Sequence, residues 1–171
     1  VISGRGTSTV IGNSLMPPEV LAAMAEASTA SVHMSELLAA AGKRVAELTG
    51  AEAAFVTSGA AAGLLLATAA CITGNDPAKI QRLPDTRGMK NEVVMHRLQR
   101  MDFDHAIRTA GVTIVEIGNV HAVYPWELES AINPNTAAVA YVFGIHMDAC
   151  LALEQVIEIA HRLGVPVIVD C

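Results

Sequence analysis

Three short stretches of the chain carry residues whose types could do chemistry, and each directly follows an apolar run. The first, Thr57–Gly63, joins such a run to a helical pattern of small residues. Backbone N–H groups point outward at a helix start, and the helix dipole favours an anion there. The small residues Gly59 and Ala60 would let a phosphate approach closely, with the hydroxyls of Thr57 and Ser58 as further donors. The alternative is a serine that caps a helix packed tightly on a sheet.

The second stretch ends in Asp170, which follows the apolar run Val165–Val169. A carboxylate at the end of a buried strand costs free energy unless it has a partner. We therefore expect a cationic or hydrogen-bonding partner for Asp170. The alternative is an aspartate that caps a following helix or begins a loop.

The third stretch is His96 and Arg97, which follow the predicted strand Glu92–Met95. Arginine binds carboxylates and phosphates through two parallel hydrogen bonds, so Arg97 is a candidate clamp for an anion. The alternative is a solvated strand end. Weaker candidates for the same clamp are Arg5, Arg87 and Arg100. The other histidines, His33, His105, His121, His146 and His161, lack the spacing of metal ligands, and we predict no metal site.

Helical and strand patterns alternate along most of the chain. The predicted helices begin at Pro17–Pro18 and then cover 35–49, 60–72, 103–110, 125–132 and 151–163. The predicted strands cover 53–57, 92–95, 112–117, 137–143 and 165–169. Nearly continuous apolar strands between helices predict a three-layer α/β fold, with a mostly parallel sheet covered on both faces. Ligands of such sheets bind at the C-terminal ends of the strands, where all three candidate stretches lie.

Composition narrows the possible functions. Of the 171 residues, 52% are hydrophobic and 16% charged, which indicates a packed interior, and a net charge of −6 gives little support for nucleic-acid binding. The longest apolar stretch, 60–72, is too short to span a bilayer, so we expect no membrane partner. Three widely spaced cysteines and no signal peptide predict reduced thiols and a cytoplasmic location.

Taken together, several segments resemble the selenocysteine synthase-like group of fold-type-I pyridoxal-phosphate (PLP) enzymes. This group contains L-seryl-tRNA(Sec) selenium transferase and D-glucosaminate-6-phosphate ammonia-lyase. The segments that carry the resemblance occur in order along nearly the whole chain: Gly6–Val20, Glu47–Gly63, Ala69–Gly74, Leu83–Thr86, Gly88–Val93 and Val165–Asp170.

The resemblance implies a PLP cofactor and assigns roles to the candidate residues. Ser58, Gly59 and Ala60 would lie at the PLP phosphate, and Asp170 would face the pyridine nitrogen. The segment 96–100 would lie beside the ring, with Gln99 as a cofactor contact and His96 and Arg97 as substrate contacts. The sequence departs from the group at three places, which are Leu98–Gln99, Cys171 and the opening Ser3–Arg5.

The Schiff-base lysine of the group belongs to a Ser-Gly-Gly-Lys-like segment downstream of the aspartate. The lysines of this chain are Lys43, Lys79 and Lys90, and none of them follows Asp170. We therefore predict no catalytic residue within the chain, a lysine after Cys171, and no activity for the 171 residues alone. Residues 1–50 would form an N-terminal arm and helices, and residues 51–171 the N-terminal part of a truncated PLP-binding large domain.

For the intact parent, the resemblance implies β-elimination or β-replacement on an amino compound. The segments Leu83–Thr86 and Phe103–Arg108 favour an amino acid or amino sugar as substrate, with an aminoacyl-tRNA as the second possibility. The resemblance also implies a homo-oligomer. Two other classes stay open: a non-catalytic pseudoenzyme or interaction module, and another α/β enzyme that binds a phosphorylated ligand.

Overall fold

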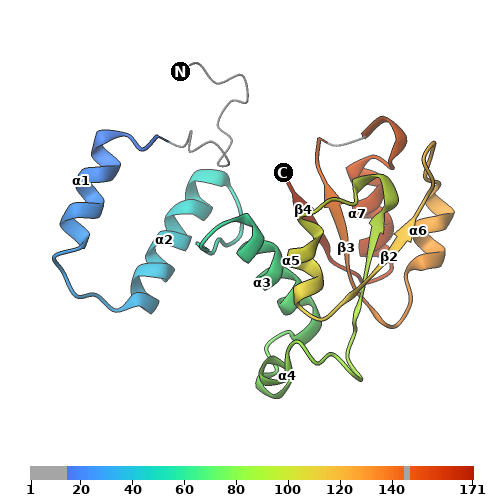
Figure 1. The fold of residues 1–171 in the computed structure, drawn as a ribbon, viewed down its shortest axis with the longest axis horizontal. Coiled ribbons are helices and arrows are strands. Elements are labelled where there is room, and N and C mark those ends of the chain that lie inside the picture. Colours follow the sequence, from blue (N-terminus) through green and yellow to red (C-terminus); the bar gives the residue numbers. More distant parts are fainter. Residues whose placement is uncertain (1–14, 145–146) are drawn as a thin grey trace. The chain divides into compact units, whose positions relative to one another are not determined.

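The computed structural model describes residues 15–144 and 147–171, which divide after Val56 into two compact units (Figure 1). The first unit contains helices α1 (Pro18–Ala27) and α2 (Met34–Thr49), and the second contains the sheet. Most of the predicted arm 1–18 lies outside the described residues, as do the candidates Arg5 and His146. The assignment of residues 1–50 and 51–171 to two parts of a larger domain stays a prediction.

The second unit contains a four-stranded sheet in which every pairing is parallel. Its strands lie in the order β2-β1-β3-β4. Their bounds are β1 (Glu92–His96), β2 (Thr113–Ile117), β3 (Thr136–Val142) and β4 (Val167–Asp170). The prediction of a parallel sheet is confirmed, and all four strands therefore present their C-terminal ends at one edge.

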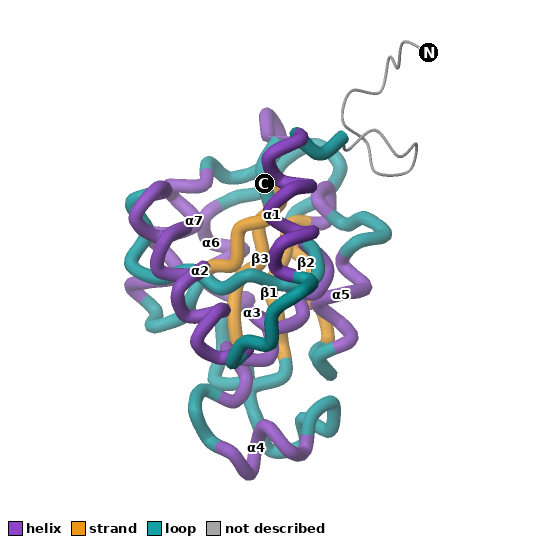
Figure 2. The backbone as a smooth tube through the Cα atoms, turned by 90° about the vertical axis from the view of Figure 1, so that its left-hand side faces the viewer, coloured by secondary structure: helices purple, strands orange, loops and turns teal. Residues whose placement is uncertain are grey.

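Helices cover both faces of this sheet, as Figures 1 and 2 show. On one face, α3 (Ala60–Thr73) and α5 (Asp104–Thr109) pack over an apolar cluster, and on the other face α6 (Pro125–Ala131) and α7 (Leu153–Arg162) pack over a second cluster. The other helical elements in the described part of this unit are α4 (Pro77–Arg82) and the single 3-10 turns η2 (Arg97–Gln99) and η3 (Met147–Ala149). The three-layer architecture predicted from the sequence is confirmed.

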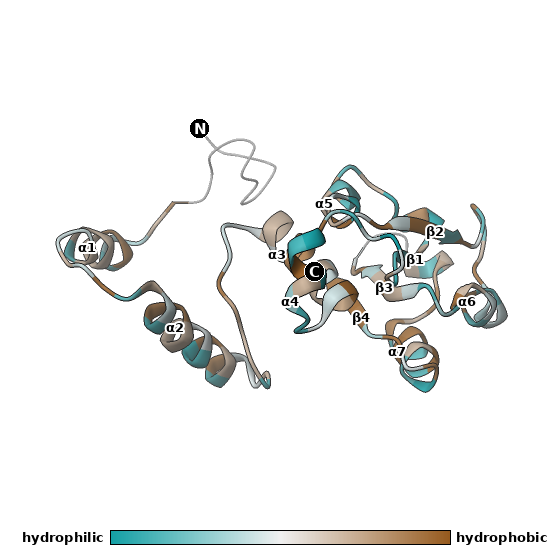
Figure 3. Cartoon of the chain, turned by 90° about the horizontal axis from the view of Figure 1, so that it is seen from below, coloured by the Kyte–Doolittle hydropathy of each residue, from teal (hydrophilic) through white to brown (hydrophobic). Residues whose placement is uncertain are grey.

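Strand β3 shows why an uninterrupted apolar run forms the centre of this sheet. All seven of its residues are buried. Its side chains alternate, so that Ala140 and Val142 join the cluster under α3 and α5, while Val139 and Tyr141 join the cluster under α6 and α7. Helix α7, which covers the second cluster, is amphipathic instead, and Figure 3 shows both hydrophobic and hydrophilic residues along it.

One predicted strand is wrong. Residues 53–57 form no strand, and Phe55 and Val56 are 65% and 46% exposed. A strand is defined by its hydrogen-bonded neighbour, and no described segment pairs with this one. Apolar composition alone does not supply that neighbour.

Within the described part of the chain, no helix is both long and apolar enough to cross a membrane.

An arginine–carboxylate network ties α5 to the edge strand β2. Asp104 has a side chain only 4% exposed, and it accepts hydrogen bonds from Arg100 (2.5 Å) and Arg108 (2.9 Å). Glu116 of β2 accepts from Arg97 (2.9 Å) and also from Arg100. Burial by itself would raise the pKa of Asp104, but the hydrogen bonds from the two arginines outweigh it and lower the pKa. The ionised carboxylate is therefore the form that the fold stabilises.

We expect Asp104→Asn to lower the free energy of unfolding by about 1–2 kcal/mol at pH 7, because the charged hydrogen bonds are lost. Because folding lowers the pKa of Asp104, its contribution is complete above the ordinary carboxyl pKa and is lost as the pH falls. Urea unfolding at pH 7 and pH 3 measures both effects, with Asp102→Asn as the exposed control. A cost that is equally large at both values would contradict this explanation.

Candidate functional site

The start of α3 presents free backbone donors. Gly59 precedes the helix with φ 148°, a conformation that side chains rarely allow. The Thr57 hydroxyl donates to the Gly59 carbonyl (2.9 Å) and accepts from the Gly59 N–H (3.3 Å), so it shapes the turn. The first helical bond runs from the Gly63 N–H to the Gly59 carbonyl (3.0 Å), which leaves the N–H groups of 60–62 without acceptors in the helix. Ser58 beside them is exposed.

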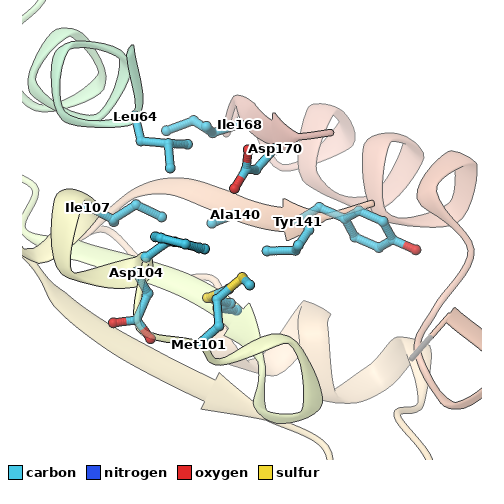
Figure 4. Close-up of a pocket in the computed structure, with 11 residues that line it drawn as sticks. Leu64, Met101, Asp104, Ile107, Ala140, Tyr141, Ile168 and Asp170 are labelled. Carbon is cyan, nitrogen blue, oxygen red and sulfur yellow. The ribbon is translucent and has the colours of Figure 1, made fainter. Parts of the chain in front are cut away.

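This end of α3 lies at the C-terminal edge of the sheet. Leu64, near the start of the helix, lines a pocket together with Met95 of β1 and the last residues of β3 and β4 (Figure 4). The other end of α3 packs near the beginning of β1, where Ile72 and Val93 belong to one cluster. Helix α3 therefore runs opposite to the strands, and its free N–H groups lie at the edge where parallel sheets bind ligands.

Asp170, the last residue of β4, turns its side chain toward the same pocket (Figure 4). Ile168, two residues earlier, packs on the cluster under α3 and α5, so Asp170 lies on that face too. Its backbone carbonyl accepts from the Phe143 N–H (2.7 Å). Within the described residues its carboxylate makes no hydrogen bond or salt bridge. The pocket has a volume of about 10 Å³, so an aromatic ring would have to lie at its mouth.

His96 lies on the opposite face of the sheet. The residue is 2% exposed, and its ring meets Tyr141 edge to face, with 5.6 Å between the ring centroids. Tyr141 belongs to the cluster under α6 and α7, and so does Val94, two residues before His96. The sheet therefore separates the imidazole of His96 from the carboxylate of Asp170.

Gln99 and Arg97 are engaged by other parts of the protein. The side-chain amide of Gln99 is fully buried. Its nitrogen donates to the Val142 carbonyl, and its oxygen accepts from the Val142 N–H. Arg97 is 61% exposed and pairs with Glu116. The structure thus brings Asp170 and the start of α3 to one edge on one face, and it brings neither His96, Gln99 nor Arg97 to that pocket.

The two weaker clamp candidates among the described residues are also paired. Arg87 binds Asp85 in an exposed loop (2.7 Å), and Arg100 belongs to the network around Asp104. The apolar wall of the pocket, to which Leu64, Phe103 and Ile107 contribute, was not predicted from the sequence. Their only signal was helical periodicity, which does not distinguish a pocket wall from any other core position.

His96 is held in one tautomer. Its Nδ1 lies 3.3 Å from Gln99 Oε1, an oxygen that also accepts from the Val142 N–H, so Nδ1 must carry the hydrogen. Its Nε2 is buried and has no partner in the described structure. Burial lowers the pKa of His96, while the bond to Gln99 and the charge of Glu127 oppose this with smaller effects. The imidazole is therefore neutral at pH 7.

Because folding lowers the pKa of His96, the unfolded chain binds the proton more tightly. The stability that depends on neutral His96 is complete above the ordinary pKa of 6.5 and is lost as the pH falls below it. We expect the free energy of unfolding to fall less steeply between pH 7.5 and about 5.5 in His96→Phe, which keeps a ring against Tyr141. Urea unfolding across this range measures the slopes, and equal slopes would refute the explanation.

The chain is similar in sequence to several known enzymes. No family model matches the chain. It is 40% identical over 99% of its length to D-glucosaminate-6-phosphate ammonia lyase from Salmonella typhimurium, and 36% identical over 99% to 5'-C-glycyluridine monooxygenase-decarboxylase from a Streptomyces species. It is 29% identical over 61% of its length to L-seryl-tRNA(Sec) selenium transferase from Actinobacillus pleuropneumoniae. It covers 48%, 45% and 25% of these relatives.

A solved structure of D-glucosaminate-6-phosphate ammonia-lyase matches the fold with a TM-score of 0.93 over 97% of this chain and 47% of that protein. The fold is thus the one that the matching part of this PLP-dependent enzyme adopts. More narrowly, the chain is a homologue of D-glucosaminate-6-phosphate ammonia lyase and of L-seryl-tRNA(Sec) selenium transferase, as the resemblance in the sequence predicted. It spans about half the length of the two relatives that it matches over nearly all of its own length.

Proposed function

We propose that the whole protein is a PLP-dependent enzyme that performs β-elimination or β-replacement on an amino acid or amino sugar. One observation carries the proposal. In a homologue of PLP enzymes, the N–H groups at the start of α3 and the carboxylate of Asp170 lie on one face of the sheet at one edge, and neither has a hydrogen-bond partner among the described residues. These two groups suit the two ends of PLP, an anionic phosphate and a pyridine nitrogen that carries a proton.

The residues present suit this cofactor. Ser58, Gly59 and Ala60 would hold the phosphate, because an exposed hydroxyl and unpaired backbone donors meet there without a side chain at Gly59. Asp170 would accept a hydrogen bond from the protonated ring nitrogen and keep the proton there. When bound, PLP supplies an electron sink for bond cleavage next to the amino group. The apolar residues around Asp170, Leu64 among them, would exclude water from the ring.

None of the chain's three lysines lines the pocket at Asp170. Lys79 and Lys90 border a hollow beside Gly74 and Asn135, at the N-terminal edge of the sheet and opposite to Asp170. Lys43 belongs to α2 in the first unit. We therefore propose that the Schiff-base lysine lies outside these 171 residues and that the chain alone is inactive. A cytoplasmic location and a homo-oligomeric parent are part of the same proposal.

Borohydride reduction of the full-length protein with bound PLP, followed by peptide mapping, tests the proposal. We expect the cofactor on a lysine outside residues 1–171 and ammonia release from an amino acid or amino sugar such as D-glucosaminate 6-phosphate. Labelling of Lys43, Lys79 or Lys90, or no labelling, would contradict it. Selenium transfer to seryl-tRNA(Sec) is the second candidate activity, because the chain also matches that transferase over 61% of its length.

A further inference from the structure

The C-terminal end of β3 loses its neighbour before it ends. The pairing of β1 with β3 stops at Met95 and Ala140, and β1 then leaves the sheet through η2. Val142 would then have unpaired backbone groups, although it is buried. A buried backbone group without a partner costs free energy comparable to that of a lost hydrogen bond.

The side chain of Gln99 fills this gap. Its Nε2 donates to the Val142 carbonyl (2.9 Å), and its Oε1 accepts from the Val142 N–H (3.1 Å). A side-chain amide has the same donor and acceptor as a peptide group, so it extends the ladder after the strand has left. His96 fixes the orientation of this amide, because its Nδ1–H donates to the same Oε1 (3.3 Å).

The residue that Gln99 holds is the partner of Asp170. Val142 and Asp170 are opposite each other in the register of β3 and β4, and the next N–H, that of Phe143, donates to the Asp170 carbonyl (2.7 Å). Gln99 therefore fixes one edge of β3 at the point where the other edge holds Asp170. The amide oxygen thus accepts two hydrogen bonds and the amide nitrogen donates one, and both bonds to Val142 hold the strand end.

We infer that Gln99 is a positioning residue, which replaces the missing strand beside Val142 and so keeps Asp170 at the pocket. The part of this inference that concerns a ligand rests on the proposed function; the part that concerns the strand end does not. This role differs from the cofactor contact that the sequence resemblance implies for Gln99.

Amide hydrogen exchange followed by NMR tests the inference on Gln99→Leu. We expect the Val142 and Phe143 amides to exchange about tenfold or more faster, relative to Val139, because two hydrogen bonds are lost locally. Val139 is the internal reference, since its N–H donates to the Pro166 carbonyl on the other edge of β3. Gln155→Leu, on the exposed surface of α7, is the matched control and should change none of these ratios.

Equal acceleration of Val142, Phe143 and Val139 would overturn the inference, because it would mean that Gln99 only stabilises the fold as a whole. Gln99→Met covers the case in which the leucine variant does not fold. It keeps the length of the side chain but loses both the donor and the acceptor, so Val142 should again exchange faster than Val139.

Binding of pyridoxine 5′-phosphate to the same variants tests the connection to Asp170. This probe carries the ring nitrogen and the phosphate but needs no lysine. We expect Gln99→Leu to weaken its binding about tenfold and Gln155→Leu to leave it unchanged. Unchanged binding in Gln99→Leu would overturn the connection to Asp170. A wild-type protein that does not bind the probe would contradict the proposed function instead, while the exchange rates still decide the role of Gln99.

Discussion

Asp170→Ala is expected to weaken the binding of pyridoxine 5′-phosphate by about 10–100-fold, the effect of losing one charge-assisted hydrogen bond. In the structure its carboxylate turns toward a pocket lined by apolar residues and has no described partner. A carboxylate in such surroundings binds a protonated ring nitrogen more strongly than a carboxylate in water does, because the surroundings are less polar. Asp170→Asn should have an intermediate effect, since the amide oxygen still accepts a hydrogen bond but carries no charge.

Isothermal titration calorimetry of the wild type and both variants measures this effect. Asp148→Ala is the control, because Asp148 is exposed in η3 and lines none of the described pockets around α3. It should leave the affinity within about twofold, since exposed charges contribute little. An Asp170→Ala protein that binds the probe as tightly as the wild type would remove Asp170 from the site.

Gly111→Ala is expected to have the largest effect on stability, a loss of roughly 2–5 kcal/mol in the free energy of unfolding. Gly111 links α5 to β2 with φ 96°, where a side chain is strained. An added Cβ would also lie 2.1 Å from the Pro84 carbonyl oxygen and 2.9 Å from Thr86 Cγ2. The loop could not move away easily, because the Thr86 hydroxyl donates to the Gly111 carbonyl (2.7 Å).

Urea unfolding measures this loss, and Gly164→Ala separates its two causes. Gly164 also has a positive φ of 71°, but an added Cβ there would meet nothing within 4 Å. It should therefore cost only the backbone strain, about 1–2 kcal/mol. Equal losses in the two variants would mean that the close approach of Pro84 to Gly111 does not matter.

The fold could largely be predicted from the sequence because its strong patterns are local. The apolar run 137–143 has no polar face, so it had to become a central strand, and β3 is buried along its whole length. Glycine and proline marked most helix ends correctly, as at Gly50 after α2 and Pro125 at the start of α6. The prediction of a strand at 53–57 was wrong because a strand also needs a neighbouring strand, and local composition does not specify one.

The candidate site could be predicted only in part, because it depends on which face of the sheet each side chain occupies. Asp170 and His96 both end strands at the same edge, yet they lie on opposite faces. The face that each side chain occupies follows from the alternation along its strand and from the helices that cover the two faces. Which helices cover a face is a long-range property of the fold. The bond from Gln99 to Val142 spans 43 residues, so no local pattern could indicate it.

We propose that the start of α3 and Asp170 bind the two ends of one ligand. An NMR titration with pyridoxine 5′-phosphate tests this, with inorganic phosphate as the comparison. We predict that pyridoxine 5′-phosphate shifts the amide resonances of residues 59–62 together with those around Asp170, with one dissociation constant, and that phosphate shifts only residues 59–62. Shifts at one end alone with pyridoxine 5′-phosphate, or shifts at neither end, would contradict the claim.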